Sequence, residues 1–104
     1  MLADRETVKL NRTDFGILGY LQDGRNIAPN MAAALDKDRN YINAQLTYLL
    51  DYGLVRKIKE PGVKRAGLYE LTDRGRVAFE HRAEYDKSDP DAFDKLIERE
   101  VADE

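Results

Sequence analysis

The sequence contains no cysteine and only one histidine. A chain without cysteine has neither a disulfide framework nor a thiolate metal site. The single histidine, His81, lies in a charged segment and is expected to be a surface or interface residue, which leaves no ligand set for a transition metal. We therefore expect no metal and no cofactor in this protein.

Motifs for catalysis and ion binding are also missing. The sequence has no glycine-rich phosphate loop, nucleophile elbow or zinc motif, so nothing in it supports an enzymatic activity. An acidic group near the C-terminus lacks the spacing and the glycine of an EF-hand calcium loop; its members are Asp86, Asp89, Asp91 and Asp94. No pocket for a small-molecule ligand is evident from the pattern.

Long apolar runs and a secretory leader are absent. The longest apolar run, Met31 to Leu35, is too short to cross a bilayer. The N-terminal segment is charged from Asp4 onward, unlike a secretory signal peptide. We expect a soluble, cytoplasmic protein that makes no membrane contact.

Charge is unevenly distributed along the 104 residues, a length that suits one domain with one modest core. The formal net charge is −3. Residues 37–69 nevertheless carry seven basic and three acidic side chains, whereas residues 1–36 and 70–104 sum to −1 and −6. For a nucleic-acid partner the distribution matters more than the sum, and here a positive segment lies between acidic flanks.

Helical signals fill the first half of the chain. Thr13 or Asp14 is predicted to cap a first helix that ends at Asp23-Gly24, and residues 25–27 are expected to form a short extended link. Pro29 fits the first turn of a second helix, which stops at residues 36–37.

A third helix is predicted to begin after Asp38, whose side chain can accept bonds from free backbone N–H groups. Gly53 ends it. Apolar residues at helical spacing give this segment an inward stripe, which consists of Ile42, Leu46, Leu49 and Leu50.

The pattern then changes period. Residues 54–59 and 68–71 are predicted to be the strands of a hairpin with a turn at Pro61-Gly62. Thr72 or Asp73 is expected to cap a fourth helix, which carries Val77, Ala78, Phe79 and Tyr85. Ser88-Asp89-Pro90 breaks it, and the last segment is predicted to be a short amphipathic helix.

This order of elements resembles the winged helix-turn-helix transcription regulators. Ala32, Leu35 and Ile42 fall in the register of that family's bihelical unit, and Leu46 follows one turn later. The stretches "YGLVRKI" and "GLYELTDRGR" are similar to the family's segments after the recognition helix and after the wing. Within the family, the sequence most resembles the phage-repressor-like proteins of halophilic archaea, over roughly residues 13–82.

The resemblance implies an α+β, mostly α, fold: a three-helix core, a two-stranded β-hairpin wing and C-terminal helices. Residues 1–88 would form the DNA-binding domain, and residues 89–104 a C-terminal amphipathic helix. One departure is the turn between the second and third helices, where the family often has glycine and then an apolar residue. This chain has Asp36 and Lys37, and aspartate tolerates the left-handed conformation better than most residues.

A recognition helix at residues 38–52 would enter the major groove of DNA with its N-terminal residues against base edges. Arginine can bond guanine bidentately, and asparagine or glutamine can bond adenine in the same way. The candidate contacts are Arg39, Asn40, Tyr41, Asn43, Ala44 and Gln45. We rank Arg39, Asn43, Asn40 and Gln45 in that order for base contact, whereas Tyr41 could bond a phosphate or pack on the second helix. The alternative is that these polar residues merely face water.

The wing, residues 54–71, would supply a second contact to the DNA backbone or the minor groove. Its candidate residues are Lys57, Lys59, Lys64 and Arg65. Because strand side chains alternate, we expect Ile58 and Arg56 to share the inner face and Lys57 and Lys59 to face outward. The alternative is that the charges protect an exposed hairpin edge from pairing.

The C-terminal helix carries an apolar stripe formed by Phe93, Leu96, Ile97 and Val101. The stripe can fold back on the first helix or pair with a second copy, and we favour the homodimer. A symmetric dimer would present two recognition helices about one DNA turn apart.

Two functions follow from these observations. The first is a sequence-specific, DNA-binding transcription regulator, with repression as an expectation from the resemblance. The second is a winged-helix module for protein–protein interaction without specific DNA binding. The positive segment at residues 37–69 favours the first, because a protein-binding wing need not be basic.

Overall fold

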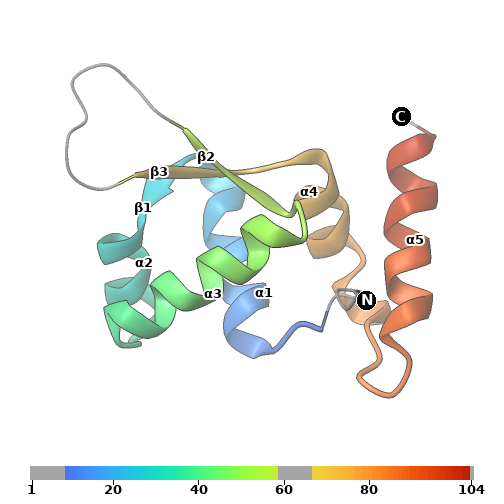
Figure 1. Cartoon of the computed structure of the whole chain (residues 1–104), viewed down its shortest axis with the longest axis horizontal. Helices are drawn as coiled ribbons and strands as arrows, with labels where there is room; N and C mark the ends of the chain where they lie inside the picture. Colours follow the sequence, from blue (N-terminus) through green and yellow to red (C-terminus); the bar gives the residue numbers. More distant parts are fainter. Residues whose placement is uncertain (1–8, 59–66, 104) are drawn as a thin grey trace.

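The computed structural model describes residues 9–58 and 67–103 of the chain (Figure 1). Its helices and strands, in chain order, are α1 (Arg12–Tyr20), the 3-10 turn η1 (Leu21–Asp23), β1 (Asn26–Ile27), α2 (Ala28–Leu35), α3 (Arg39–Asp51), β2 (Val55–Ile58), β3 (Leu68–Leu71), α4 (Asp73–Glu80), the 3-10 turn η2 (Arg82–Glu84) and α5 (Pro90–Ala102). None of the helices in these two ranges is both long and apolar enough to span a bilayer.

Helix α1 begins earlier than the sequence predicted. Its N-cap is Asn11, whose side chain accepts from the backbone N–H of Asp14, while the Asp14 carboxylate accepts from the N–H of Asn11. This capping box leaves Thr13 and Asp14 inside the helix, and both are buried. The prediction of Thr13 or Asp14 as the cap was therefore wrong by two or three residues.

The turn between α2 and α3 agrees with the sequence. Asp36 takes the left-handed conformation with φ of 57°, and the N–H of Lys37 donates to the carbonyl of Ala32 at 2.9 Å. Asp38 then caps α3 by accepting from the N–H of Asn40 at 2.9 Å. A single left-handed residue thus sets the direction from which α3 approaches the core.

The inward stripe of α3 forms the centre of the core. Ile42, Leu46 and Leu49 are completely buried, and Leu50 is half-buried. They pack with residues of α1 and α2, among them Ile17, Leu18 and Met31. Gly53, with φ of 74°, follows the C-cap Tyr52 and lets the chain turn into β2.

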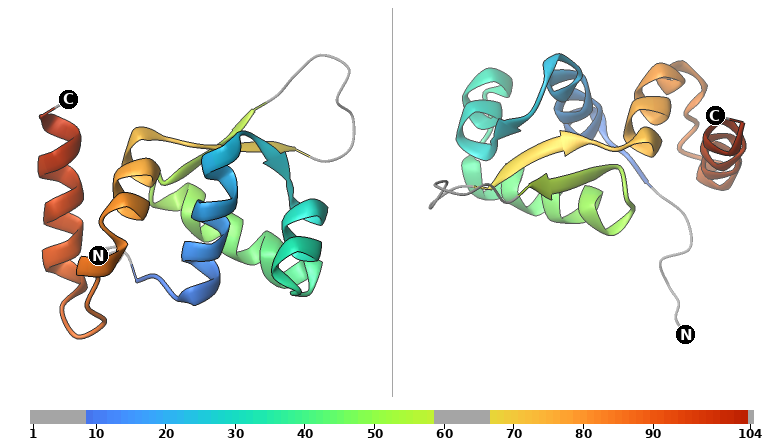
Figure 2. Two further views of the ribbon diagram at one scale, coloured as in Figure 1. Left: turned by 180° about the vertical axis from the view of Figure 1, so that it is seen from behind. Right: turned by 90° about the horizontal axis from the view of Figure 1, so that it is seen from above.

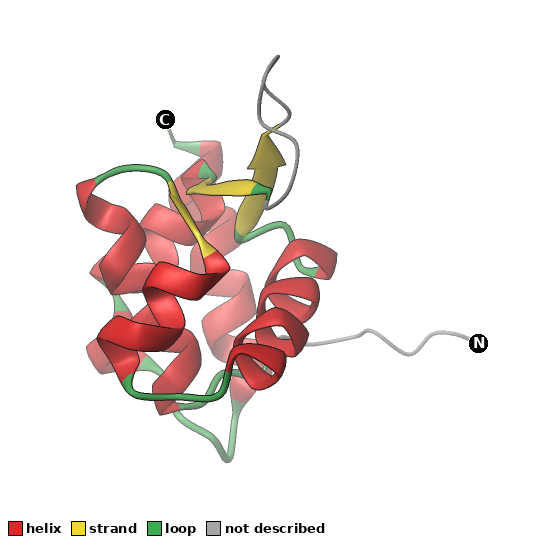
Figure 3. Ribbon diagram, turned by 90° about the vertical axis from the view of Figure 1, so that its left-hand side faces the viewer, coloured by secondary structure: helices red, strands yellow, loops and turns green. Residues whose placement is uncertain are grey.

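The sheet has one more strand than the predicted hairpin. Strands β2 and β3 pair antiparallel, with Val55 opposite Leu71 and Ile58 opposite Leu68. The link at residues 25–27 is partly a strand, because β1 pairs with the other edge of β3. The predicted turn at Pro61-Gly62 lies outside the described residues. The sheet lies at one end of the helical body (Figure 3), so the fold is a winged helix-turn-helix, as the sequence predicted.

Helices α4 and α5 close the other side of the molecule and lie next to each other (Figure 2). Thr72 caps α4 by accepting from the N–H of Gly75, and Asp89 caps α5 by accepting from the N–H of Ala92. Tyr85, which the sequence placed in the fourth helix, follows the turn η2 instead. Its ring packs against Phe15 and Phe93, with centroids 5.6 and 5.2 Å away.

Candidate nucleic-acid interface

An open groove of about 390 Å³ separates the start of α3 from the base of the hairpin. It is bordered by the first residues of α2 and α3 and by facing positions of β2 and β3. The lining residues are Ala28, Pro29, Arg39, Asn40, Asn43, Lys57, Gly67 and Tyr69. The helix-turn-helix and the wing therefore meet on one side of the molecule, where both could contact the same ligand.

Three polar residues of α3 line this groove: Arg39, Asn40 and Asn43. All three side chains are exposed, and among the residues that the structure describes none takes part in an ion pair or a side-chain hydrogen bond. We call this set the groove edge of α3. Ala44, next to it, is also exposed. The DNA contacts assigned to these four residues stay predictions, and their exposure is compatible with them.

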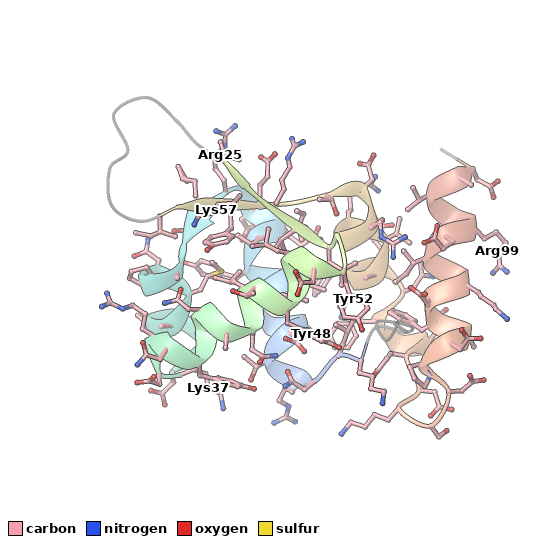
Figure 4. All side chains as sticks on the ribbon, viewed as in Figure 1. Arg25, Lys37, Tyr48, Tyr52, Lys57 and Arg99 are labelled. Atoms are coloured by element: carbon pink, nitrogen blue, oxygen red, sulfur yellow. The ribbon has the colours of Figure 1, made fainter. Side chains whose placement is uncertain are left out.

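Lys57 lies on the opposite face of the hairpin from the one that the sequence predicted. Strand alternation places it on the same face as the buried Val55, and it sits opposite Tyr69, above whose ring its ammonium lies 5.8 Å from the centroid. Ile58 shares the outer face with Arg56 instead. Val55 and Tyr69 set the inner face, and Lys57, two residues beyond Val55, borders the groove. Lys57 is labelled on the hairpin in Figure 4.

The other basic residues near the hairpin are either outside the described residues or paired with an acidic side chain. Lys59, Lys64 and Arg65 lie outside the described residues. On the outer face of the hairpin, Arg56 forms an ion pair with Glu70, and Arg25 from the link before β1 approaches the same carboxylate at 3.9 Å. By contrast, Lys37, Arg39 and Lys57 have no ion-pair partner within residues 9–58 and 67–103. Arg39 and Lys57 line the groove, so unpaired positive charge borders it.

Two of the six predicted recognition-helix contacts face elsewhere. Gln45 is half-buried and donates from Nε2 to Oδ1 of Asp14 at 2.6 Å, so one of its two amide N–H groups is already engaged. The hydroxyl of Tyr41 accepts from Nδ2 of Asn11 at 3.1 Å. This bond directs the side chain of Gln45 toward α1, and Gln45 does not line the groove, which argues against a base contact in this arrangement. Tyr41 is thus bonded to the N-cap of α1, and its contact with a phosphate stays a prediction.

Tyr48 continues the same row one turn further along α3. Its hydroxyl accepts from the backbone N–H of Lys9 at 2.7 Å and donates to the carbonyl of the same residue (Figure 4). Burial raises the pKa of Tyr48 to about 12, so the phenol keeps the proton that it donates. We call Tyr41, Gln45 and Tyr48 the anchored edge of α3.

Asp14 is the buried partner of the anchored edge. Its carboxylate is 1 % exposed and accepts from the backbone of Asn11 and the side chain of Gln45. Burial raises the pKa of this carboxyl above its ordinary value of 3.8, although the two hydrogen bonds lower it. Sequence reasoning missed this role. The available signal was the Asn11-x-x-Asp14 spacing of a capping box together with polar residues at positions 41, 45 and 48.

The apolar stripe of α5 is mostly buried against the rest of the same chain. Phe93 is 2 % exposed and Ile97 is fully buried, whereas Leu96 and Val101 are half-buried. The prediction that Phe93 and Ile97 form a dimer interface is contradicted, since both side chains already pack against the chain's own core. The alternative, folding back on the first helix, describes Phe93, which meets Phe15 of α1 at 6.4 Å between ring centroids. Helix α5 as a whole packs mainly on α4.

Candidate metal ligands do not gather in this fold. Within the described parts of the chain, no three side chains of histidine, aspartate or glutamate are arranged to hold an ion. His81 lies 3.4 Å from Glu84 on the turn after α4, at the surface of the molecule.

Comparison with known proteins places the fold among transcription regulators. No protein-family profile matches the sequence, and no curated protein matches it. Solved structures do match, among them the transcriptional regulator BldR from Sulfolobus solfataricus, with 27 % identity, a TM-score of 0.67, and 72 % of this chain covered. The chain spans 54 % of the length of BldR.

Two further structures show the same fold at lower identity. ZitR from Lactococcus lactis, a zinc-responsive MarR family member, has 20 % identity and a TM-score of 0.67 over 99 % of this chain and 69 % of its own. A mutant MarR from E. coli, solved with operator DNA, has 22 % identity and a TM-score of 0.64 over 69 % of this chain and 52 % of its own. The structural neighbours are thus winged-helix regulators of the MarR type.

Proposed function

We propose that this chain is a sequence-specific, DNA-binding transcription regulator. Helix α3 would lie in the major groove, and the hairpin of β2 and β3 would contact the DNA backbone or the minor groove. The observation that carries the proposal is the groove edge, whose three exposed side chains have no polar partner among the described residues and line the same groove as Lys57. The operator DNA bound to the MarR structure supports it, because that protein shares this fold.

The chemistry of the groove edge suits base recognition. Arg39 offers a planar fork of donors for the acceptors of guanine, and Asn43 offers one donor and one acceptor for adenine. The two residues are four positions apart on one side of α3, which corresponds to roughly 6 Å along the helix axis. That distance is less than two steps of about 3.4 Å along a DNA strand, so both side chains can address neighbouring base pairs.

Lys57 would have a different task from the groove edge. Its ammonium carries a point charge without the paired geometry that distinguishes one base from another. Located at the base of the hairpin, it is suited to neutralise a phosphate beside the major groove and so to increase affinity for any duplex. Lys59, Lys64 and Arg65 would extend this contact along the hairpin.

The proposal includes a homodimer in the cytoplasm that represses transcription by occupying a promoter. Two copies related by a two-fold axis would read two half-sites about one DNA turn apart. Leu96 and Val101 are the members of the α5 stripe that keep part of their surface exposed and can contribute to the interface. The sign of regulation is an expectation from the resemblance to known repressors.

We also propose that this chain is related to the phage-repressor-like proteins of halophilic archaea. The support is the wording "GLYELTDRGR" and the excess of aspartate over glutamate in the sequence. A salt-adapted protein is expected to unfold at a higher temperature in molar potassium chloride than in dilute buffer. Equal melting temperatures in both solutions would contradict this finer assignment.

The decisive experiment is selection of binding sites from random duplexes at two salt concentrations. We expect one enriched sequence with two-fold symmetry, bound more weakly at the higher salt because phosphate contacts release counterions. An enriched sequence without symmetry would refute the dimer but keep the DNA-binding function. No enrichment at either salt would refute the proposal and favour a protein-interaction module.

A further inference from the structure

Helix α3 has two polar edges that lie on different sides of its buried stripe. With about 100° between successive residues, positions 41, 45 and 48 fall within roughly 60° of one another, and positions 39 and 43 lie about half a turn away. The completely buried residues Ile42, Leu46 and Leu49 occupy the angle between the two edges. Any rotation of α3 that moves one edge must therefore move the other.

Every residue of the anchored edge is bonded to one short stretch of chain, residues 9–14. The partners differ in kind: Tyr41 is held by the amide of Asn11, Gln45 by the carboxylate of Asp14, and Tyr48 by the backbone of Lys9. The stretch is itself fixed, since Leu10 is 3 % exposed and its N–H donates to the hydroxyl of Tyr85 at 2.9 Å.

We infer that the anchored edge sets the rotation of α3 about its axis, and that Asp14 and Gln45 are positioning residues for the groove edge. The inference rests on the proposed function. Apolar packing of the buried stripe holds α3 against the core. The three side-chain bonds of the anchored edge add a directional constraint on its rotation, because a hydrogen bond weakens steeply away from its preferred geometry. Asp14 and Gln45 touch no DNA in this arrangement and act through Arg39 and Asn43.

The hydrogen bond between Asp14 and Gln45 is the one to test, because its donor and acceptor can be exchanged between the two positions by mutation. Gln45→Glu places a second carboxylate against Asp14 and removes the donor. Adding Asp14→Asn restores a donor and an acceptor: the amide nitrogen gained at position 14 donates to the carboxylate gained at position 45, while the amide oxygen still accepts from Asn11. Gln22→Glu, at an exposed position of η1, is the control for the added charge.

Binding of the full chain would be measured on the selected duplex, on random duplex and on duplexes changed at each base pair. For Gln45→Glu we expect the ratio of specific to random affinity to fall by about tenfold, within the range of coupling between neighbouring groups. The loss should be spread over all base pairs that α3 reads. The double variant should recover to within about threefold of wild type, and Gln22→Glu should bind like wild type.

Tyr41→Phe is the second variant, in case Gln45→Glu does not fold. It removes only the exposed hydroxyl that accepts from Asn11, so the chain should fold, and the ratio should fall by about twofold, again spread over several base pairs. A melting temperature measured for each variant separates loss of folded protein from misplacement of α3.

Three results would overturn the inference while leaving the proposed function intact. They are a loss confined to one base pair, which would make Gln45 a direct contact; a double variant that does not recover; and a Tyr41→Phe variant that folds with an unchanged ratio. A wild-type chain that binds selected and random duplexes equally would overturn the proposed function itself, and the inference with it.

Discussion

The two edges of α3 each carry a carboxamide side chain, but the surroundings of these two side chains are opposite. Asn43 on the groove edge and Gln45 on the anchored edge both carry a carboxamide, two positions apart in the sequence. The amide of Asn43 is exposed beside the groove, whereas the amide of Gln45 meets the buried carboxylate of Asp14. What a polar side chain on a recognition helix can do is therefore decided by which neighbour it faces, and not by its type.

The largest effect should come from a change that affects both edges together. Leu46 is completely buried between them, so Leu46→Ala leaves a cavity and should lower the free energy of unfolding by about 2–5 kcal/mol. Urea titration followed by circular dichroism measures this loss. Leu50→Ala, at the half-buried end of the stripe, is the control and should cost less. Equal losses for both would mean that the core is not centred where the structure places it.

The next largest effect should come from a substitution that changes the groove edge alone. Arg39→Ala should remove roughly 1–3 kcal/mol of discrimination at one base position and leave the unfolding free energy nearly unchanged, since the side chain is exposed. Gel-shift titration on duplexes changed one base pair at a time measures the discrimination. Arg99→Ala, on the exposed surface of α5 (Figure 4), controls for loss of one positive charge. Equal losses on specific and random DNA would refute the role of Arg39.

Most of the fold could be predicted from the sequence, because several elements depend on local preferences. The buried stripe of α3 and the left-handed Asp36 both follow from local preferences, helical spacing in one case and backbone sterics in the other. The third strand was missed because residues 26 and 27 form only two pairs, both with β3, and such a short segment has no pattern of its own.

The candidate site was only partly accessible from the sequence. Periodicity identified the outward residues of α3 but could not separate its two edges, because the partner of Gln45 lies 31 positions away in α1. The face of Lys57 was inverted because Ile58 was taken as the inward residue, whereas the start of β2 at Val55 sets the alternation. Long-range contacts, which no local rule supplies, decided both points.

A smaller effect tests whether Lys57 belongs with the groove edge or acts independently of it. Lys57→Ala should weaken binding to all duplexes alike and reduce the slope of log affinity against log salt by about one. Titrations at several salt concentrations on selected and random DNA give both slopes. Lys87→Ala, an exposed lysine near the start of α5, should leave the slope unchanged. A loss limited to the selected duplex would instead assign Lys57 to base recognition.

The smallest expected effect is the pH dependence of stability that comes from Asp14, the buried partner of the anchored edge. Burial raises the pKa of this carboxyl in the folded chain, so the folded state holds its proton more tightly than the unfolded state. Its contribution to stability is therefore greatest below the ordinary pKa of 3.8 and decreases as the pH rises through the folded-state value. The effect is small because the bonds from Asn11 and Gln45 oppose the desolvation.

Asp14→Asn removes this titration, so the unfolding free energy of wild type minus that of the variant should decrease as the pH is raised from about 4, the ordinary aspartate pKa, toward neutrality. Urea titrations of both proteins across this interval give the difference directly. Asp23→Asn, at an exposed position, corrects for removal of a carboxylate as such. A difference that increased with pH would mean that hydrogen bonding outweighs burial at Asp14, and that the anchored edge favours the charged form of its buried partner.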